Sequence, residues 1–334
     1  MASGHAPTAA LLISWRRICW IGLGTPEFGR LEVHVSLTRR SALRLAGVSA
    51  ILVGSRNASA RQNELVRESI YNYIIVSRDN SIVSFRRMEN GAAVSTVDVD
   101  LPSYQIIPYT KYLFAGALLD PNPNSVLNIG LGAGSFNRLF NLAYPDATLT
   151  TVEIDPMIRD LAVEFTSFAE TARNKVVIED GRRFLHRSSN LWDWIVIDAF
   201  VRNSQYPPHL ATLEFFRLAA DHLTDGGLLT INIIRGNKLF DCLVTTIAAA
   251  FEGCLVFDVP GKGNAVVVAS KNKRSSLEHA VQSSAPAIAP LLLANGVDLN
   301  EIAAGGSAPT PGNCSGALTD DYSPTEFLGG QQQK

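Results

Sequence analysis

The sequence lacks several features that would place it quickly in a functional class. Its 29 Lys and Arg against 31 Asp and Glu leave a formal charge of −2, so there is no basic excess for binding a nucleic-acid backbone. No run reaches the about 18 uninterrupted apolar residues of a stable membrane span. The four cysteines form no CxxC pair and no metal-ligand spacing, which argues against a disulfide scaffold and a zinc site. We therefore expect small-molecule partners and no metal.

The composition that remains is that of a globular α/β protein. The chain has 334 residues, of which 46% are hydrophobic and only 18% are charged. This length is enough for a large domain with a smaller companion. A low charged fraction excludes general disorder and is typical of a parallel sheet that is buried on both faces.

Residues 1–60 have the layout of a leader. Arg39 and Arg40 precede a mildly apolar run at 45–53 and the small-residue sequence NASA at 57–60. This order predicts a twin-arginine signal for export to the periplasm. The alternative is an N-terminal extension of a cytoplasmic protein. Residues 1–37, with Trp15 and Trp20, fit neither interpretation, and a translation start after them would explain this.

Strand patterns dominate residues 61–105, which we predict to form a small β domain. Residues 71–76 and 82–85 flank the turn-like triplet 78–80 as a hairpin. Asn90-Gly91 is a second turn signal before a third strand at 92–99.

Strands and helices alternate through residues 106–272. This order predicts a doubly wound, Rossmann-like sheet of the methyltransferase type, with an antiparallel pair at its end. Residues 273–334 are predicted to be a tail with one helix at 290–295. The expected strands are 125–129, 149–153, 175–178, 194–197, 228–234, 255–259 and 265–269, and the expected helices between them are 136–143, 157–168, 182–186, 213–223 and 239–251.

A glycine-rich turn follows the first strand of this domain. Gly130, Gly132 and Gly134 form a G-x-G-x-G pattern before a helix, which lets the backbone approach a ligand at the helix N-terminus. The dinucleotide pattern would require Gly or Ala where Ser135 stands. The pattern therefore favours an S-adenosyl ligand over NAD, although a tight turn without a ligand also uses glycines.

Acidic residues stand at the ends of the next three strands. Glu153 is placed to accept hydrogen bonds from both ribose hydroxyls, Asp180 to accept the adenine amino protons, and Asp198 follows a buried apolar strand. Each is also a reasonable helix N-cap. Because the carboxyl ends of parallel strands meet at one edge, glycines followed by three acids favour a nucleoside-type ligand there.

These motifs resemble the spermidine synthases, the polyamine aminopropyltransferases, over about residues 66–270. The resemblance is carried by the segments Glu68-Ser69-Ile70-Tyr71, G-x-G-x-G, Val152-Glu153-Ile154-Asp155, Glu179-Asp180-Gly181 and Ile197-Asp198.

The resemblance implies a role for each matching residue. Asp198 would be the catalytic acid-base residue, and Tyr71 and Tyr109 would contact the substrate. Decarboxylated S-adenosylmethionine would be the co-substrate, with no permanently bound cofactor. Dimers are common in the family, and nothing in these residues requires one. The nucleoside contacts would come from Gly130, Gly132, Gly134, Glu153, Asp155, Asp180 and Gly181.

Other residues depart from the family pattern. A second acid that holds the amine is replaced by Val201, and Lys111 would repel a polyamine if it lay near the site. His209 is a second candidate for proton transfer or substrate binding, with a structural role as the alternative. Asp320 and Asp321 are candidates to restore negative charge to the pocket, but a solvated surface pair is the favoured alternative.

We therefore predict an aminopropyltransferase that acts on a di- or polyamine with Asp198 as base. An S-adenosylmethionine-dependent methyltransferase is the first alternative, and a basic or amide contact near the glycine turn would favour that intact ligand. A non-catalytic nucleoside-binding module is the second alternative, favoured by the lost acid. An NAD-linked oxidoreductase is less consistent with Ser135.

Overall fold

A small antiparallel sheet precedes the main domain. The computed structural model describes residues 64–328, apart from 89, 90, 121, 202–205, 237, 262, 284, 285, 311, 313, 326 and 327, so the predicted leader lies outside the described residues. The small sheet consists of β1 (Glu64–Glu68), β2 (Tyr73–Asp79), β3 (Ile82–Arg86) and β4 (Ala93–Asp98) in that order. The predicted hairpin is formed by β2 and β3, with Asp79 paired to Ile82.

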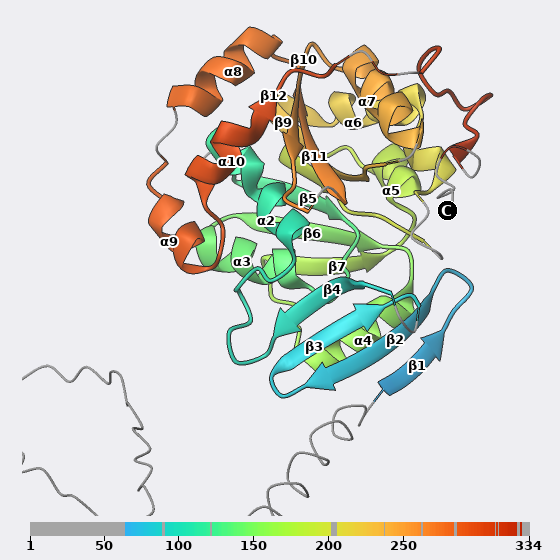
Figure 1. The fold of residues 1–334 in the computed structure, drawn as a ribbon, viewed down its shortest axis with the longest axis vertical. Helices are drawn as coiled ribbons and strands as arrows, with labels where there is room; N and C mark the ends of the chain where they lie inside the picture. The colour runs from blue at the N-terminus through green and yellow to red at the C-terminus, as the bar shows by residue number, and fades with distance from the viewer. Residues whose placement is uncertain are drawn as a thin grey trace, which may run out of the picture. The chain divides into compact units, whose positions relative to one another are not determined.

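The small sheet does not have a core of its own. Its buried Val83 and Phe85 belong to one apolar cluster with Leu131 of the glycine turn and with Ile158 and Leu161 of α4 (Pro156–Thr166). Figure 1 shows the small sheet lying against α4. Since residues two apart on a strand face the same side, the alternation of β3 aims one row of its side chains at the main domain.

The main domain has the predicted doubly wound sheet. Among the described residues it has eight strands in the order β12-β10-β11-β9-β8-β5-β6-β7, with β5 to β9 parallel and β10 to β12 forming an antiparallel edge. Strand β9 pairs parallel with β8 on one side and antiparallel with β11 on the other, so it joins the two regions. The strands are β5 (Ser125–Ile129), β6 (Thr148–Glu153), β7 (Asn174–Ile178), β8 (Trp192–Ile197), β9 (Leu223–Ile234), β10 (Gly253–Asp258), β11 (Asn264–Ser270) and β12 (Gly306–Ser307).

Helices cover both faces of this sheet, as predicted for the fold class. Apolar side chains of α5, α6 and α7 pack in the cluster on one face, and those of η1, α3, α8, α9 and α10 pack in the cluster on the other. Figure 1 shows these two groups on opposite sides of the strands. None of the described helices is both long and apolar enough to cross a membrane. Besides α4, the helices are α2 (Pro108–Tyr112), η1 (Leu113–Leu118), α3 (Ser135–Ala143), α5 (Gly181–Arg187), η3 (Pro208–Leu210), α6 (Leu213–Asp221), α7 (Lys238–Ala250), α8 (Arg274–Ser283), α9 (Ala289–Ala294) and α10 (Leu299–Gly305).

The C-terminal segment is more ordered than the single helix expected from its sequence. It contains α8, α9 and α10, and β12 pairs with β10 at the sheet edge. The helices are short and bury few side chains, such as Leu277 and Val281 of α8 and Leu299 and Ile302 of α10. Such sparse apolar spacing in a Ser- and Ala-rich stretch gives a weak helical signal.

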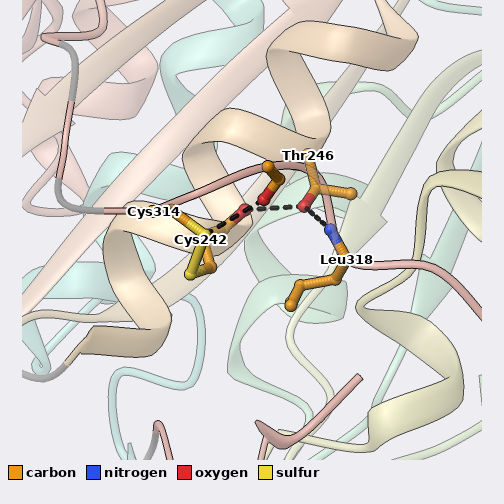
Figure 2. Close-up of a disulfide and its surroundings, with 5 residues drawn as sticks. Cys242, Thr246, Cys314 and Leu318 are labelled. Carbon is orange, nitrogen blue, oxygen red and sulfur yellow. Dashed lines mark hydrogen bonds between the residues drawn. A yellow bond between two sulfur atoms is a disulfide. The ribbon is translucent and has the colours of Figure 1, made fainter. Parts of the chain in front are cut away.

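A disulfide links this segment to α7. Cys242 of α7 and Cys314 are bonded across 72 residues of sequence. Figure 2 shows Thr246 beside them: its hydroxyl donates to the Cys242 carbonyl at 2.6 Å and accepts from the Leu318 backbone N–H at 2.9 Å. The cysteine spacings gave no reason to pair these two residues, because only the folded chain brings them together.

Candidate active site

A cavity of about 530 Å³ lies at the carboxyl ends of the parallel strands. Its walls include Gly130 after β5, Glu153 at the end of β6 and Asp198 after β8, and Ile74 and Phe85 of the small sheet close another side. This is the position where open α/β sheets bind ligands, and the volume suits a nucleoside-sized molecule.

Most of the predicted site residues meet in this cavity. The predicted residues that line it are Tyr109, Gly130, Gly132, Glu153, Asp180, Gly181, Asp198 and His209. Gly134, Asp155 and Tyr71 are not among the residues that line it. The roles of all eleven stay predictions.

The glycine turn is held against the end of β8. Gly130 has a φ of +104°, and a Cβ at this position would lie 2.3 Å from the Asp198 carbonyl oxygen. The Asp198 backbone N–H also donates to the Ile129 carbonyl at 2.9 Å. A side chain at Gly130 would therefore displace the segment that carries Asp198.

Glu153 is buried and points at the glycine turn. One carboxylate oxygen accepts from the Leu131 backbone N–H at 3.0 Å, and the other accepts from the Asp155 N–H at 2.9 Å. Burial raises the pKa of Glu153 to about 6, against the opposing effect of these two hydrogen bonds. Lone pairs that the backbone leaves open could accept hydrogen bonds from sugar hydroxyls.

Asp155 does not line the cavity but connects segments next to it by hydrogen bonds. Its carboxylate accepts from the Ser69 hydroxyl at 2.6 Å, from the Asn72 side-chain amide at 2.9 Å and from the Met157 backbone N–H at 3.0 Å. These bonds join the β1–β2 connection to the N-terminus of α4. Tyr71 lies in that connection and donates its backbone N–H to Ser69.

Asp180 and His209 are joined by a hydrogen bond at the cavity wall. The His209 Nε2 lies 2.6 Å from an Asp180 carboxylate oxygen. The other oxygen of Asp180 caps α5 by accepting from the Arg183 backbone N–H at 2.8 Å. Hydrogen bonds from His209 and Arg183 hold the pKa of Asp180 below its ordinary value, despite the opposing effect of burial, which is the largest single contribution. The imidazole is thus part of the structure that holds Asp180.

Asp198 is held by a chain of amides from the neighbouring strands. The side-chain amide of Asn232 on β9 donates to Asp198 at 2.9 Å, and the Asn232 carbonyl accepts from the Asn264 amide of β11 at 2.9 Å. This second bond fixes which end of Asn232 faces Asp198. Asn232 was not among the residues predicted from the sequence, although a polar residue within the apolar run of β9 could have pointed to it.

Burial raises the pKa of Asp198 above its ordinary value, against hydrogen bonds from Asn232 and Tyr109 and the charge of Arg87. The single hydroxyl proton of Tyr109 is shared between Asp198 and the Val94 carbonyl, whose oxygen lies 2.7 Å from the Tyr109 oxygen. Burial and the adjacent Asp198 raise the pKa of Tyr109 well above its ordinary value, so the phenol stays protonated. A buried carboxylate with a raised pKa is a stronger proton acceptor than an exposed one.

A basic side chain lines the cavity, but it is not the one that the sequence suggested. Lys111 is not a lining residue, and its Nζ lies 6.0 Å from the ring centroid of Tyr104. Arg87 lines the cavity instead and donates to the Phe200 carbonyl at 2.8 Å. The sequence could have pointed to Arg87, because it follows Val83 and Phe85 at intervals of two and residues at that interval in an extended chain face the same side.

The tail does not bring its acids to the cavity. Asp320 pairs with Arg182 at 2.6 Å and accepts from Thr212 at 2.8 Å. The bond with Arg182 is the main reason that the pKa of Asp320 falls to about 2. Val201, which stands where the resemblance leads one to expect a second acid, lines the cavity.

Comparison with known proteins assigns the chain to a family. Residues 109–238 match the spermine/spermidine synthase domain. The chain is 30% identical over 244 residues to a polyamine aminopropyltransferase of Vibrio vulnificus, covering 70% of this chain and 81% of the relative. It is 33% identical over 279 residues to a probable polyamine aminopropyl transferase of Bifidobacterium longum, covering 78% of this chain and 61% of that longer relative.

A solved structure shows the same fold. A probable spermidine synthase from Corynebacterium glutamicum superposes with a TM-score of 0.58 at 21% identity, covering 76% of this chain and 98% of that chain. The chain is thus an α/β protein with the Rossmann-like methyltransferase fold and a cavity at the carboxyl ends of its parallel strands. The chain belongs to the spermine/spermidine synthase family, and its relatives are named as polyamine aminopropyltransferases.

Proposed function

We propose that the protein transfers an aminopropyl group from decarboxylated S-adenosylmethionine to an amine, with Asp198 as the base. Glu153 and the glycine turn would hold the nucleoside, and Asp180 would contact the adenine. Family membership supports the general reaction. The roles of single residues rest on their positions in the cavity.

The proposed reaction is a single displacement. The neutral nitrogen of the amine attacks the carbon next to the sulfonium, a C–N bond forms, and the C–S bond breaks. The electron pair of that bond stays on sulfur, which leaves as the thioether of methylthioadenosine. Asp198 accepts the proton that the nitrogen loses. Because the sulfonium is a good leaving group, orientation of the two substrates supplies much of the remaining rate.

The observation that carries this proposal is the environment of Asp198. It is a desolvated carboxylate with a raised pKa in a nucleoside-sized cavity, oriented by Asn232 and in contact with Tyr109. A structural N-cap would not need an orienting amide chain from two other strands.

The role of Asp198 is tested by comparing Asp198→Asn with Asp221→Asn. Asp221 is an exposed carboxylate at the end of α6 and serves as the matched control. We expect Asp198→Asn to lower methylthioadenosine production by about 100-fold or more while methylthioadenosine still binds. The control should keep both properties. Undiminished turnover in Asp198→Asn would remove Asp198 from the role of base.

We also propose that the protein works in an oxidising compartment after export. The disulfide between Cys242 and Cys314 supports this, because such bonds persist outside the reducing cytoplasm. The leader-like pattern around Arg39 and Arg40 points the same way. Cell fractionation tests this proposal independently of any assay of turnover.

A further inference from the structure

Arg87 places a positive charge where a polyamine enzyme would be expected to hold negative charge. Burial lowers the pKa of its guanidinium, against the opposing effect of the nearby carboxylates of Asp198 and Glu153. One Nη donates to the Phe200 carbonyl, two residues after Asp198. The Nε atom is buried and has no hydrogen-bond partner in the described part of the chain.

The acids around Arg87 do not satisfy it. In the part of the chain that the structure describes, neither Glu153 nor Asp198 lies within 4.0 Å of it as an ion pair. Glu153 accepts instead from two backbone N–H groups, and Asp198 accepts from Asn232. A guanidinium presents a planar fork of donors that matches a carboxylate. Arg87 therefore has N–H donors next to the proposed base that no described residue accepts, its buried Nε among them.

The proposed substrates bring more positive charge into the cavity than its acids can balance. Decarboxylated S-adenosylmethionine carries a sulfonium and an ammonium, and a simple diamine keeps one further positive charge when its attacking nitrogen is neutral. Glu153 and Asp198 face these three charges, while Arg87 adds a fourth. Even if Asp180, which is hydrogen-bonded to His209, is counted with them, three acids face four positive charges. Enclosed charges need partners, so a ligand carboxylate would correct an excess of positive charge.

We propose that Arg87 binds a carboxylate of the ligand that meets Asp198, so that one of the two substrates carries an acid beside its amine. This carboxylate has two chemical sources. It belongs either to an amino-acid-like acceptor or to an intact S-adenosylmethionine donor. The inference rests on the proposed function for an S-adenosyl donor and an amine acceptor. An intact donor would replace the decarboxylated one proposed above, whereas an amino-acid-like acceptor would leave the proposed donor unchanged. The test measures binding without turnover.

Two pairs of probes isolate the carboxylate by calorimetry on the full chain. S-adenosylhomocysteine and its decarboxylated form differ by this group on the donor side. Ornithine and putrescine differ by it on the acceptor side, and are measured with methylthioadenosine bound. We expect the carboxylated member of one pair to bind about 10- to 100-fold more tightly than its partner. Preference within the first pair assigns the carboxylate to the donor, and preference within the second assigns it to the acceptor.

Variants then connect the preference to Arg87. Arg87→Gln should abolish the preference and leave the affinity for methylthioadenosine within about threefold, because methylthioadenosine has no carboxylate for the guanidinium to bind. Arg87→Lys should keep part of the preference, since it retains the charge without the fork. Arg86→Gln is the matched control, because Arg86 pairs with Glu64 of β1 and does not line the cavity. It should behave as wild type.

The wild-type comparison alone can overturn the proposal. Equal binding within both pairs, or preference for the uncarboxylated member of both, contradicts it even if a variant fails to fold. Retention of a wild-type preference in Arg87→Gln also contradicts it. Absence of aminopropyl transfer would refute the proposed function and leave these binding results unaffected.

Discussion

Protonation of Glu153 should oppose nucleoside binding and favour folding over the same pH range. Its pKa of about 6 lies above the ordinary 4.5 because the carboxyl is buried. The folded protein therefore binds a proton more tightly than the unfolded chain does. Stability contributed by this group is present below pH 4.5 and is lost as the pH rises through 6. The loss amounts to about 2 kcal/mol.

Nucleoside binding should show the opposite slope. The ionised Glu153 can accept from both ribose hydroxyls, whereas the protonated form must use one oxygen as a donor. If only the ionised form binds, the Kd of methylthioadenosine is constant above pH 7 and rises about tenfold by pH 5. Calorimetry from pH 5 to pH 8 measures this directly.

Substitution identifies the group that titrates. Glu153→Gln should weaken methylthioadenosine by about 1–3 kcal/mol at pH 8 and flatten the pH profile between 5 and 7. Glu179→Gln is the control, because Glu179 pairs with Arg187 at 2.8 Å and does not line the cavity. An unchanged affinity or an unchanged pH profile in Glu153→Gln would place the ribose elsewhere.

Three further predictions concern the base, the disulfide and the leader. Tyr109→Phe removes a hydrogen bond that lowers the pKa of Asp198, so the acidic limb of the kcat/KM profile should move to higher pH. An unmoved limb would show that Tyr109 does not influence the group that titrates there. Reduction of the disulfide, which closes a loop of 72 residues, should cost about 4 kcal/mol of stability by chain entropy. Denaturant melts with and without dithiothreitol measure that cost, and equal midpoints would contradict it. Replacement of Arg39 and Arg40 by Lys should retain the protein in the cytoplasm, and unaltered fractionation would refute the twin-arginine interpretation.

The fold was predictable because its signals are local. Short apolar runs alternate with helical patterns between 125 and 270, and a run such as β8, with Trp194 to Ile197 all buried, has few alternatives to a central strand. Glycines and acids at successive strand ends then predict a shared edge, because parallel strands end on the same side. The cavity that contains Gly130, Glu153 and Asp198 lies at that edge.

The features that sequence reasoning missed depend on packing between distant segments. Arg87 reaches the cavity only because the small sheet packs against α4 and the glycine turn. Lys111 is closer to Tyr109 along the chain, yet its Nζ lies 6.0 Å from the Tyr104 ring centroid and it does not line the cavity. The partner of Cys242 is 72 residues away. For Arg87 and Cys242 the decisive neighbour is distant in sequence.

The most direct test of the account is the product that the full chain makes. The purified protein is offered decarboxylated and intact S-adenosylmethionine separately, each with an amine panel that includes putrescine and ornithine, and the mixtures are analysed by mass spectrometry. The account predicts methylthioadenosine together with an amine enlarged by one aminopropyl group. S-adenosylhomocysteine with a methylated amine, or no product from either donor, would contradict it.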